Sequence, residues 1–449
     1  MHPASPHPLG WLGIVRLGLV QTALGAVVVL TTSTINRVMV VELALPAMLP
    51  GALVALHYAI QVLRPRLGHG SDVGGRRTPW IVGGMAVLAL GGTGAALATA
   101  TMASNTALGV ALAVLAFVLV GVGVGASGTS LLVLLAKRTA PERRPAAATI
   151  VWMMMIFGFI LTAALAGQAL DPFSLTRLVI VSGAVGAFAL LVTVLAVWGV
   201  EGDGRQAAVA EDGQAAGEPV PFRRALREVW QETQARRFTV FIFVSMLAYS
   251  AQDLILEPFA GTVFGMTPGE STQLAGFQNG GVLLGMLLVA VFANRIGTLR
   301  GWTVGGCVAS ALALATIATG GFAAGTFPLR GAVFALGLAN GVFAVAAIGS
   351  MMTLVGAGRG GREGVRMGLW GAAQAVAFGI GGFAGTVAID VTRALVEAPA
   401  AAYAVVFCAE GTMFVVAAWM AVWAGRGATT QGPAPSRVET LAAAGAAVS

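Results

Sequence analysis

Four charged side chains lie inside long apolar runs of the sequence, where charges are rare. Arg37 and Glu42 share one run, and Asp253 and Glu257 share another. An ionisable group near the centre of a lipid bilayer costs roughly 2.5 to 3.5 kcal/mol, so each one needs a partner or a function. A spacing of four residues places Asp253 and Glu257 on one helical face, where two buried carboxylates repel each other unless a cation is near. The four residues predict a membrane-embedded ion pair or gate.

Other kinds of chemistry are excluded by the composition. The chain has four His, two Cys and no Cys/His cluster, so we predict no dedicated metal site. No nucleophile stands beside a base, so we predict no catalytic residue and no enzyme. Basic residues outnumber acidic ones by 26 to 19, but Lys137 is the single lysine. This is not the lysine-rich pattern of a nucleic-acid binder, and we expect no nucleic-acid partner.

Membrane helices must position the charged residues. The chain of 449 residues is 57% hydrophobic and 10% charged, with a mean hydropathy of +0.85, whereas soluble domains are about 25% charged. A membrane helix needs about 20 mostly apolar residues. Runs of this kind predict twelve spans, at residues 17–41, 47–66, 79–100, 107–136, 146–168, 177–199, 238–263, 272–293, 301–324, 330–355, 365–389 and 402–424. The predicted fold class is an all-α membrane protein with the lipid bilayer as its partner.

The distribution of basic residues predicts the orientation of these spans. Of the 26 Lys and Arg residues, 22 fall on the side that holds both termini, so we expect both termini in the cytoplasm. A polar insertion divides the spans six and six. The predicted parts are a cytoplasmic N-tail (1–16), an N-terminal six-helix bundle (17–199), a cytoplasmic linker (200–237), a C-terminal six-helix bundle (238–424) and a disordered cytoplasmic C-tail (425–449).

Glycine is abundant, and three of its pairs are spaced by four residues. They are Gly121/Gly125, Gly337/Gly341 and Gly381/Gly385. Such pairs let helix backbones approach closely. We expect close packing inside the bundles, and the alternative is a docking face for a partner helix.

The loop after the second span has a recognisable pattern. A Gly is followed by an Asp four residues on, a Gly three further and then two basic residues: Gly68, Asp72, Gly75, Arg76 and Arg77. This spacing resembles the signature loop of the major facilitator superfamily. The resemblance implies two six-helix bundles that rock about a central cleft, with this loop as a cytoplasmic latch. The alternative is a positively charged anchor in which Thr78 caps the next helix.

A narrower resemblance covers nearly the whole chain. The strings at residues 56–65 (LHYAIQVLRP), 68–72 (GHGSD) and 249–261 (YSAQDLILEPFAG) resemble the bacteriochlorophyll delivery family, which contains the PucC-type and LhaA-type assembly factors of photosynthetic bacteria. The resemblance implies a non-enzymatic inner-membrane protein. Such a protein delivers pigment to light-harvesting antenna polypeptides or assembles them, so the expected partners are those polypeptides and (bacterio)chlorophyll, bound transiently.

In the resembled fold the first and seventh spans face each other across the cleft. Arg37 is therefore expected to pair with Asp253 or Glu257 and to gate the outer side. Two alternatives stay open, namely polar contacts to a bound head group or ring substituent, and proton coupling. Asp390 and Glu410 lie near the ends of the last two spans, where we expect snorkelling to the interface.

His57 is an isolated imidazole in the second span, and Gln61 lies one turn later on the same face. A chlorin's Mg²⁺ lacks an axial ligand, which a neutral imidazole can supply while a second group holds its other nitrogen. We therefore predict a pigment-binding role for His57 and Gln61. The alternative is a structural histidine that is hydrogen-bonded to an adjacent helix.

Two functions remain compatible with the sequence. The first is an antenna assembly factor that binds or delivers (bacterio)chlorophyll. The second is a proton-coupled secondary transporter of a small solute. A solute carrier needs several polar groups near the middle of the membrane, whereas a pigment carrier needs apolar surface.

Overall fold

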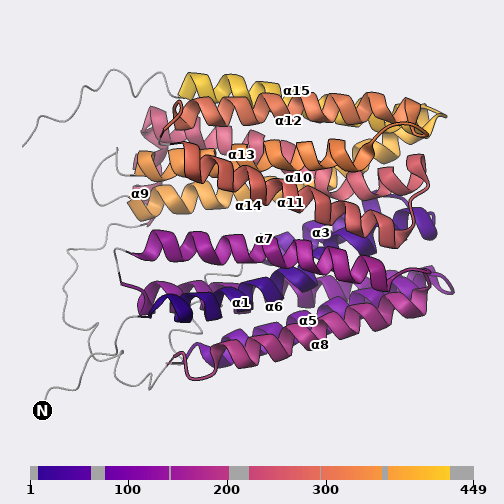
Figure 1. The fold of residues 1–449 in the computed structure, drawn as a ribbon, viewed down its shortest axis with the longest axis horizontal. Coiled ribbons are helices and arrows are strands. Elements are labelled where there is room, and N and C mark those ends of the chain that lie inside the picture. Colours follow the sequence, from indigo (N-terminus) through magenta and orange to yellow (C-terminus); the bar gives the residue numbers. More distant parts are fainter. Residues whose placement is uncertain are drawn as a thin grey trace, which may run out of the picture.

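The computed structural model describes residues 9–61, 76–140, 143–201, 222–293, 295–355 and 363–424. Within these ranges the chain is helical and contains no strand. Figure 1 shows the long helices running side by side, with the N-terminal ones (indigo to magenta) below the C-terminal ones (orange to yellow). The predicted all-α class is confirmed.

The N-terminal bundle opens with one continuous apolar helix, Trp11–Glu42. It consists of α1 (Trp11–Val29), the π-helical stretch η1 (Leu30–Thr34), α2 (Ile35–Arg37) and a second π-helical stretch, η2 (Val38–Glu42). The bundle continues with α3 (Met48–Ile60), α5 (Thr78–Met102), α6 (Thr106–Arg138), α7 (Arg144–Ala169) and α8 (Leu175–Val197). Polar side chains fix two of the helix starts, because Asn105 and Ser174 accept hydrogen bonds from the first turns of α6 and α8.

The C-terminal bundle follows a short amphipathic helix, α9 (Phe222–Gln231). Its members are α10 (Thr233–Phe264), α11 (Pro268–Phe292), α12 (Leu299–Gly320) with the short 3₁₀ turn η6 (Gly321–Ala323), α13 (Leu329–Val355), α14 (Glu363–Leu395) and α15 (Pro399–Ala424). Thr267 and Glu270 form a capping box at the start of α11. Helix α10 begins five residues before the predicted seventh span.

Eleven helices of the described chain are long and apolar enough to cross a membrane. The remaining predicted span, 47–66, coincides with α3, whose 13 described helical residues are too few for a full crossing. Residues 62–66 lie outside the described residues. The structure thus provides a helix at the position of each of the twelve predicted spans.

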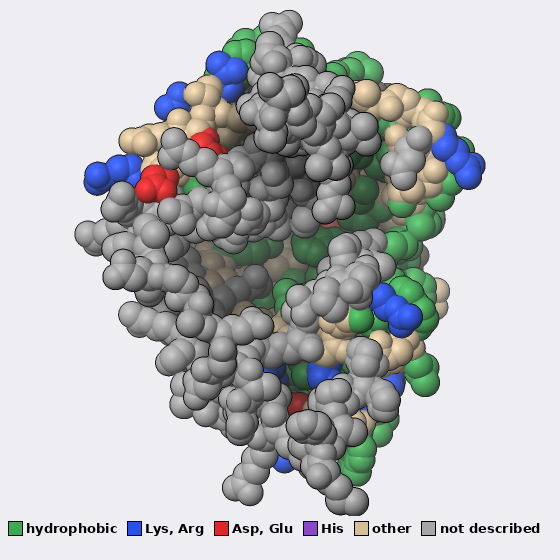
Figure 2. Space-filling model, turned by 90° about the vertical axis from the view of Figure 1, so that its left-hand side faces the viewer, with side chains coloured by type: hydrophobic (Ala, Val, Ile, Leu, Met, Phe, Trp, Pro, Cys, Tyr) green, Lys and Arg blue, Asp and Glu red, His purple; other side chains and the backbone are tan. Residues whose placement is uncertain are grey.

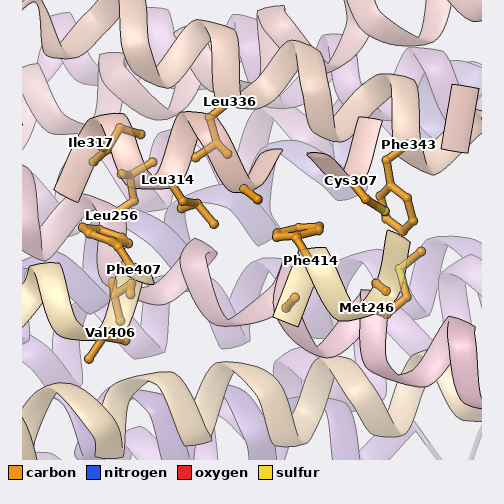
Figure 3. Close-up of a cluster of buried hydrophobic side chains, with 14 of the residues drawn as sticks. Met246, Leu256, Cys307, Leu314, Ile317, Leu336, Phe343, Val406, Phe407 and Phe414 are labelled. Carbon is orange, nitrogen blue, oxygen red and sulfur yellow. The ribbon is translucent and has the colours of Figure 1, made fainter. Parts of the chain in front are cut away.

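Apolar cores hold the helices of each bundle together, and some core residues come from the other bundle. In the C-terminal bundle the core joins α10, α12, α13 and α15, and Figure 3 shows its members. Leu256, Leu314, Leu336 and Phe407 are each at most 2% exposed. Phe259 meets Phe407 edge to face with ring centroids 5.0 Å apart, a favoured geometry for aromatic pairs.

The glycine pairs lie where helices come closest. A Cβ added at Gly337 or Gly341 in α13 would overlap main-chain carbonyl oxygens of α11. One added at Gly381 or Gly385 in α14 would press on α10, and one at Gly121 in α6 would press on α3. The prediction of close packing is confirmed at these five positions.

Two helix pairs make the most extensive contacts between the bundles, α7 with α11 and α3 with α14, and the first helix adds contacts to α10 and α11. We call the two ends of the molecule the hairpin end and the terminal end. The hairpin end carries the connections at 43–47, 103–105, 170–174, 265–267, 324–328 and 396–398, and it lies to the right in Figure 1. The terminal end is the opposite one, where α1 begins and α15 ends.

Candidate functional site

The first helix presents a row of polar side chains to the C-terminal bundle near the hairpin end. The π-helical stretches η1 and η2 flank this row, and such irregularities in a helix are frequent at functional sites. Each of these polar side chains has a partner in the C-terminal bundle. Ser33 Oγ donates to Glu257, and Thr34 Oγ1 lies 2.9 Å from Thr272 Oγ1. Asn36 Nδ2 donates to Leu254 O at 2.7 Å, and Arg37 Nη2 donates to Met266 O at 2.5 Å.

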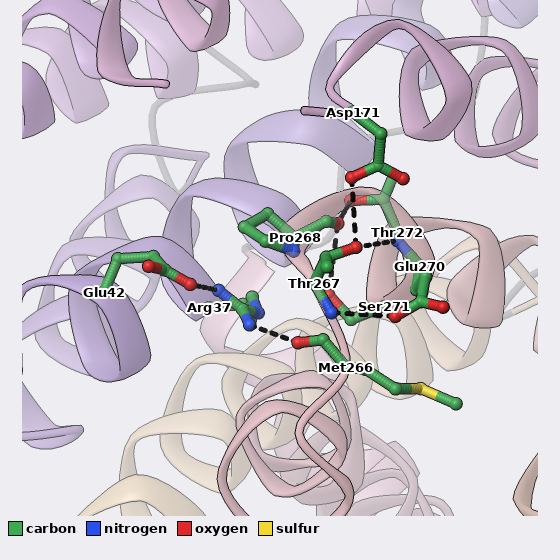
Figure 4. A network of polar contacts seen from close by, with 9 residues as sticks. All are labelled: Arg37, Glu42, Asp171, Met266, Thr267, Pro268, Glu270, Ser271 and Thr272. Carbon is green, nitrogen blue, oxygen red and sulfur yellow. Dashed lines mark hydrogen bonds and ion pairs between the residues drawn. The ribbon is translucent and has the colours of Figure 1, made fainter. Parts of the chain in front are cut away.

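Arg37 forms its ion pair with Glu42, as Figure 4 shows. The acid within ion-pair distance is thus Glu42 and not the predicted Asp253 or Glu257, although the charge of Arg37 also acts on Glu257. The reason is the π-helical turn from Val38 to Glu42, since a π-helix bonds residue i to residue i+5 and so brings Glu42 one turn above Arg37. An α-helix would have placed these two side chains on different faces. The Arg37 side chain is 2% exposed and the Glu42 side chain is 34% exposed.

Asp253 and Glu257 have separate surroundings although they are four residues apart. Glu257 is buried and accepts the hydrogen bond from Ser33. Asp253 is half-buried and is hydrogen-bonded by the Gln278 side chain of α11. The two carboxylates therefore belong to different environments.

Two further contacts close the hairpin end. Thr267 Oγ1 donates to Asp171 Oδ1 at 3.0 Å, which links the α7–α8 connection to the start of α11 (Figure 4). Asp390 accepts the main-chain N–H groups of Ala47 and Met48 at 2.9 and 2.6 Å and so caps α3 from the other bundle. The expectation that Asp390 snorkels is wrong, because its carboxylate is held by the unpaired N–H groups of a helix start.

Glu410 does not snorkel either. Its side chain is 3% exposed within the C-terminal bundle.

The hydrogen bonds that the structure describes between the two bundles all lie in the half of the molecule nearer the hairpin end. Figure 2 views the molecule from the terminal end and shows a hollow between the upper and lower halves. The arrangement is closed at the hairpin end and hollowed at the terminal end.

Part of the predicted latch loop falls outside the described residues, namely Gly68, Asp72 and Gly75. Arg76 is exposed and Arg77 is half-buried just before α5. The main-chain N–H groups of Arg77 and Thr78 donate to the Glu201 carboxylate. The alternative in which Thr78 caps α5 with its own side chain is not what the structure shows, because Glu201 accepts the first N–H groups of this helix.

The contacts of Glu201 should make the stability of the folded protein depend on pH. Burial alone raises the pKa of its carboxyl, but the hydrogen bonds from Arg77 and Thr78 and the charge of Arg76 outweigh burial and lower that pKa. The stabilisation is therefore complete above the usual pKa of a glutamate and is lost as the pH falls through the lowered value. We expect Glu201→Gln to cost about 1 kcal/mol near neutral pH. Unfolding curves in detergent should show wild type and variant converging as the pH falls, and a constant difference would contradict this cap.

His57 and Gln61 meet as predicted, with His57 Nε2 and Gln61 Nε2 2.9 Å apart. The imidazole is 2% exposed and packs beside the Tyr58 ring at 4.9 Å. An axial ligand must present a nitrogen to the face of a broad ring, and a buried imidazole does not. The geometry favours the structural histidine over the predicted pigment ligand.

A different pair of side chains faces the space between the bundles. Between Ala248 and Ala260, every residue of α10 is buried except Tyr249 and Asp253. The two are four residues apart and so form a single partly exposed stripe. The Tyr249 ring lies 5.8 Å from the Phe378 ring of α14, which in turn lies 5.8 Å from the Tyr58 ring of α3. These three rings, contributed by both bundles, form an aromatic wall beside Asp253.

Our reading of the sequence assigned no role to Tyr58, Tyr249, Phe378 or Gln278. A usable signal existed, because the chain has only three tyrosines and two of them meet in this wall. Tyrosine adds a polar handle to an apolar ring, which suits a binding surface with one wet side. We call the wall, Asp253 and Gln278 together the aromatic cleft.

Comparison with known proteins places the chain in a family. Residues 34–426 match the family described as PUCC protein. The chain belongs to the PUCC family. A relative from Rhodobacter capsulatus, named bacteriochlorophyll synthase 44.5 kDa chain, is 55% identical over 94% of this chain and 97% of its own length. Protein PucC of Cereibacter sphaeroides is 29% identical over 90% of each chain. The resemblance inferred from the sequence is thereby confirmed.

Solved structures show the fold of this PUCC-family protein. A bacterial homologue of the human lysosomal transporter Spinster, in an inward-facing and unoccupied conformation, aligns with a TM-score of 0.69 at 14% identity, covering 94% of this chain and 98% of that one. A D-xylose-proton symporter aligns with a TM-score of 0.69 at 14% identity, covering 91% and 96%. The predicted major facilitator fold of two six-helix bundles is confirmed, and at such identities the likeness concerns the fold alone.

Proposed function

We propose that this protein is a photosynthetic antenna assembly factor that binds or delivers (bacterio)chlorophyll to light-harvesting polypeptides. Membership of the PUCC family carries the proposal, together with a 55% identical relative whose name refers to bacteriochlorophyll. The aromatic cleft supports it, because a wall of three rings suits a flat apolar ligand better than a polar solute. On this proposal the chain binds cargo and performs no catalysis, although the name of that relative contains the word synthase.

The second candidate is a proton-coupled transporter of a small solute. The transporters among the solved neighbours favour it at the level of fold. The cleft separates the two candidates, since a solute carrier needs several polar groups around its substrate. Three aromatic rings lie beside Asp253 and Gln278, and the other carboxylate that interacts with Asp253, Glu410, is buried in the C-terminal bundle. This composition favours the pigment-binding assembly factor over the solute transporter.

The proposal is tested by purifying the tagged full-length protein from a pigment-producing photosynthetic host in mild detergent. We expect the preparation to show a bacteriochlorophyll absorption band and to contain small antenna polypeptides, identified by mass spectrometry. The control is the same purification from a host that lacks pigment synthesis, which should give a colourless protein. A colourless preparation from the pigmented host, free of antenna polypeptides, would refute the proposal.

We also propose that the terminal end faces the cytoplasm and that the protein resides in the inner membrane. The excess of Lys and Arg on that side supports the orientation. Aromatic anchors accompany the charges there: Arg143 lies 5.4 Å from the Trp11 ring centre, and Arg237 lies 3.9 Å from that of Trp423. Such pairs belong at the boundary between lipid and water.

Cysteine labelling of intact cells tests this orientation. Ser104 is exposed at the hairpin end and Gln231 is exposed at the terminal end. In a Cys408→Ala background, which removes the exposed native thiol, Ser104→Cys should react with an impermeant thiol reagent. Gln231→Cys should react only after the membrane is permeabilised. The reverse pattern would invert the topology.

A further inference from the structure

Asp253 lacks the cation that a carboxylate inside a membrane protein normally requires. Arg37 forms its ion pair with Glu42 and donates to Met266 O, and its charge acts on Glu257 rather than on Asp253. The Gln278 side chain supplies Asp253 with a neutral hydrogen bond, which leaves its charge uncompensated. An uncompensated carboxylate away from water is costly. Its partly buried position beside the ring wall points to a positive centre on a ligand.

The surroundings of Asp253 define the shape of that ligand. Tyr249 and Asp253 form the single partly exposed stripe of α10 between Ala248 and Ala260. The wall of Tyr58, Phe378 and Tyr249 joins both bundles through ring contacts tilted by 52° and 51°. Aromatic side chains offer broad apolar contact to a flat ring at little entropic cost. The ligand therefore has a flat apolar body with a positive centre that takes an oxygen donor.

We infer that the aromatic cleft binds the ring of a magnesium chlorin, with Asp253 rather than His57 as the axial ligand to the metal. The inference rests on the proposed function, which supplies the class of cargo. Mg²⁺ prefers oxygen ligands and often takes carboxylates, and a chlorin leaves its metal short of one axial ligand. Asp253 offers a partly exposed carboxylate beside a wall of rings. His57 is buried against Tyr58 with Gln61 at one of its nitrogens.

Ligation and ring packing can be separated by using two ligands. The purified full-length protein is titrated with magnesium bacteriochlorophyllide and, separately, with metal-free bacteriopheophorbide, and absorption and Trp fluorescence report binding. Wild type should bind the magnesium form more tightly. Asp253→Leu should weaken binding of the magnesium form by about tenfold or more and leave the metal-free form unchanged. Phe378→Ala should weaken both forms, because it removes ring contact from each.

Two further variants serve as controls. Glu397→Leu removes an acid from the exposed connection at the hairpin end and should change neither affinity. Asp253→His keeps a donor atom, so it should retain the preference for the magnesium form while shifting its absorption band, and it covers the case in which Asp253→Leu folds poorly.

The outcomes distinguish this inference from the proposed function. If wild type prefers the magnesium form and Asp253→Leu keeps that preference, Asp253 is not the ligand and the inference is wrong while pigment binding stands. Equal weakening of both forms by Asp253→Leu also overturns it, because the residue then only shapes the cleft. If wild type binds neither form, the inference fails, and co-purification of antenna polypeptides still decides the assembly role.

Discussion

Replacing Glu42 by leucine should destabilise the protein by about 3 to 5 kcal/mol, more than replacing Arg37, the residue with which it pairs. The two partners differ in access to water, since the Arg37 side chain is 2% exposed and that of Glu42 is 34% exposed. Glu42→Leu removes the acid in direct contact with a buried guanidinium, which keeps the Met266 carbonyl and the more distant charge of Glu257. Arg37→Met strands a carboxylate that can turn to water. Urea or thermal unfolding of the purified variants in detergent measures the difference.

The double variant Arg37→Met, Glu42→Leu provides the control. If Glu42→Leu acts by stranding Arg37, the double variant should be more stable than the sum of the two single losses predicts, by about 1 to 3 kcal/mol. Additive losses would show that the pair does not interact. Arg37→Met should lower the free energy of unfolding by the same amount in the wild type and in the Asp253→Leu variant, because Arg37 does not pair with Asp253.

The fold was predictable because each membrane helix is marked by a long run of apolar residues. A run of about 20 apolar residues has one low-energy arrangement in a bilayer, and each run is read independently of the others. The starts of α6, α8 and α11 also follow from local residues, since Asn105, Ser174 and Thr267 are good caps in sequence as well as in structure.

The partners of the charged residues were less predictable, because they depend on geometry that a regular helix does not have. The Arg37–Glu42 pair follows from a π-helical turn, and nothing in the string from Val38 to Glu42 distinguishes it from an α-helix. Asp390 and Glu201 act at the starts of helices far away in sequence, α3 and α5. Such long-range caps depend on how helices are arranged, which local periodicity does not report.

Burial also distinguishes two residues that the sequence alone makes equally suitable as ligands. His57 and Asp253 both stand in apolar runs, and the sequence favoured His57 because imidazole is a familiar metal ligand. The His57 side chain of α3 is buried in the protein, whereas the Asp253 side chain of α10 is partly exposed. Which face of a membrane helix meets lipid, protein or a cleft depends on its neighbours, and a helix apolar on all sides does not encode that in its sequence.

Substituting Gly341 by valine should prevent stable packing of the C-terminal bundle. A Cβ at Gly341 would overlap the main-chain carbonyl oxygen of Val282 in α11, and backbone cannot yield as a flexible side chain does. Helices α11 and α13 would have to separate, which breaks contacts along their whole length, and Gly337 depends on the same close approach. Overpacking usually costs 1 to 3 kcal/mol, and with backbone as the obstacle we expect about 3 kcal/mol or more.

The matched control lies on the same helix. Gly331 is exposed near the start of α13, and a Cβ there would meet no atom within 4 Å. Gly331→Val should therefore leave the amount of folded protein in the membrane unchanged, whereas Gly341→Val should remove most of it, as measured by fluorescence-detected size-exclusion chromatography of solubilised membranes. Gly341→Ala should be intermediate, since it brings the same Cβ without the branching methyl groups. Equal yields of Gly341→Val and Gly331→Val would show that α11 and α13 do not rely on backbone contact. The glycines would then be better explained as a docking face for a partner helix, the alternative that their spacing left open.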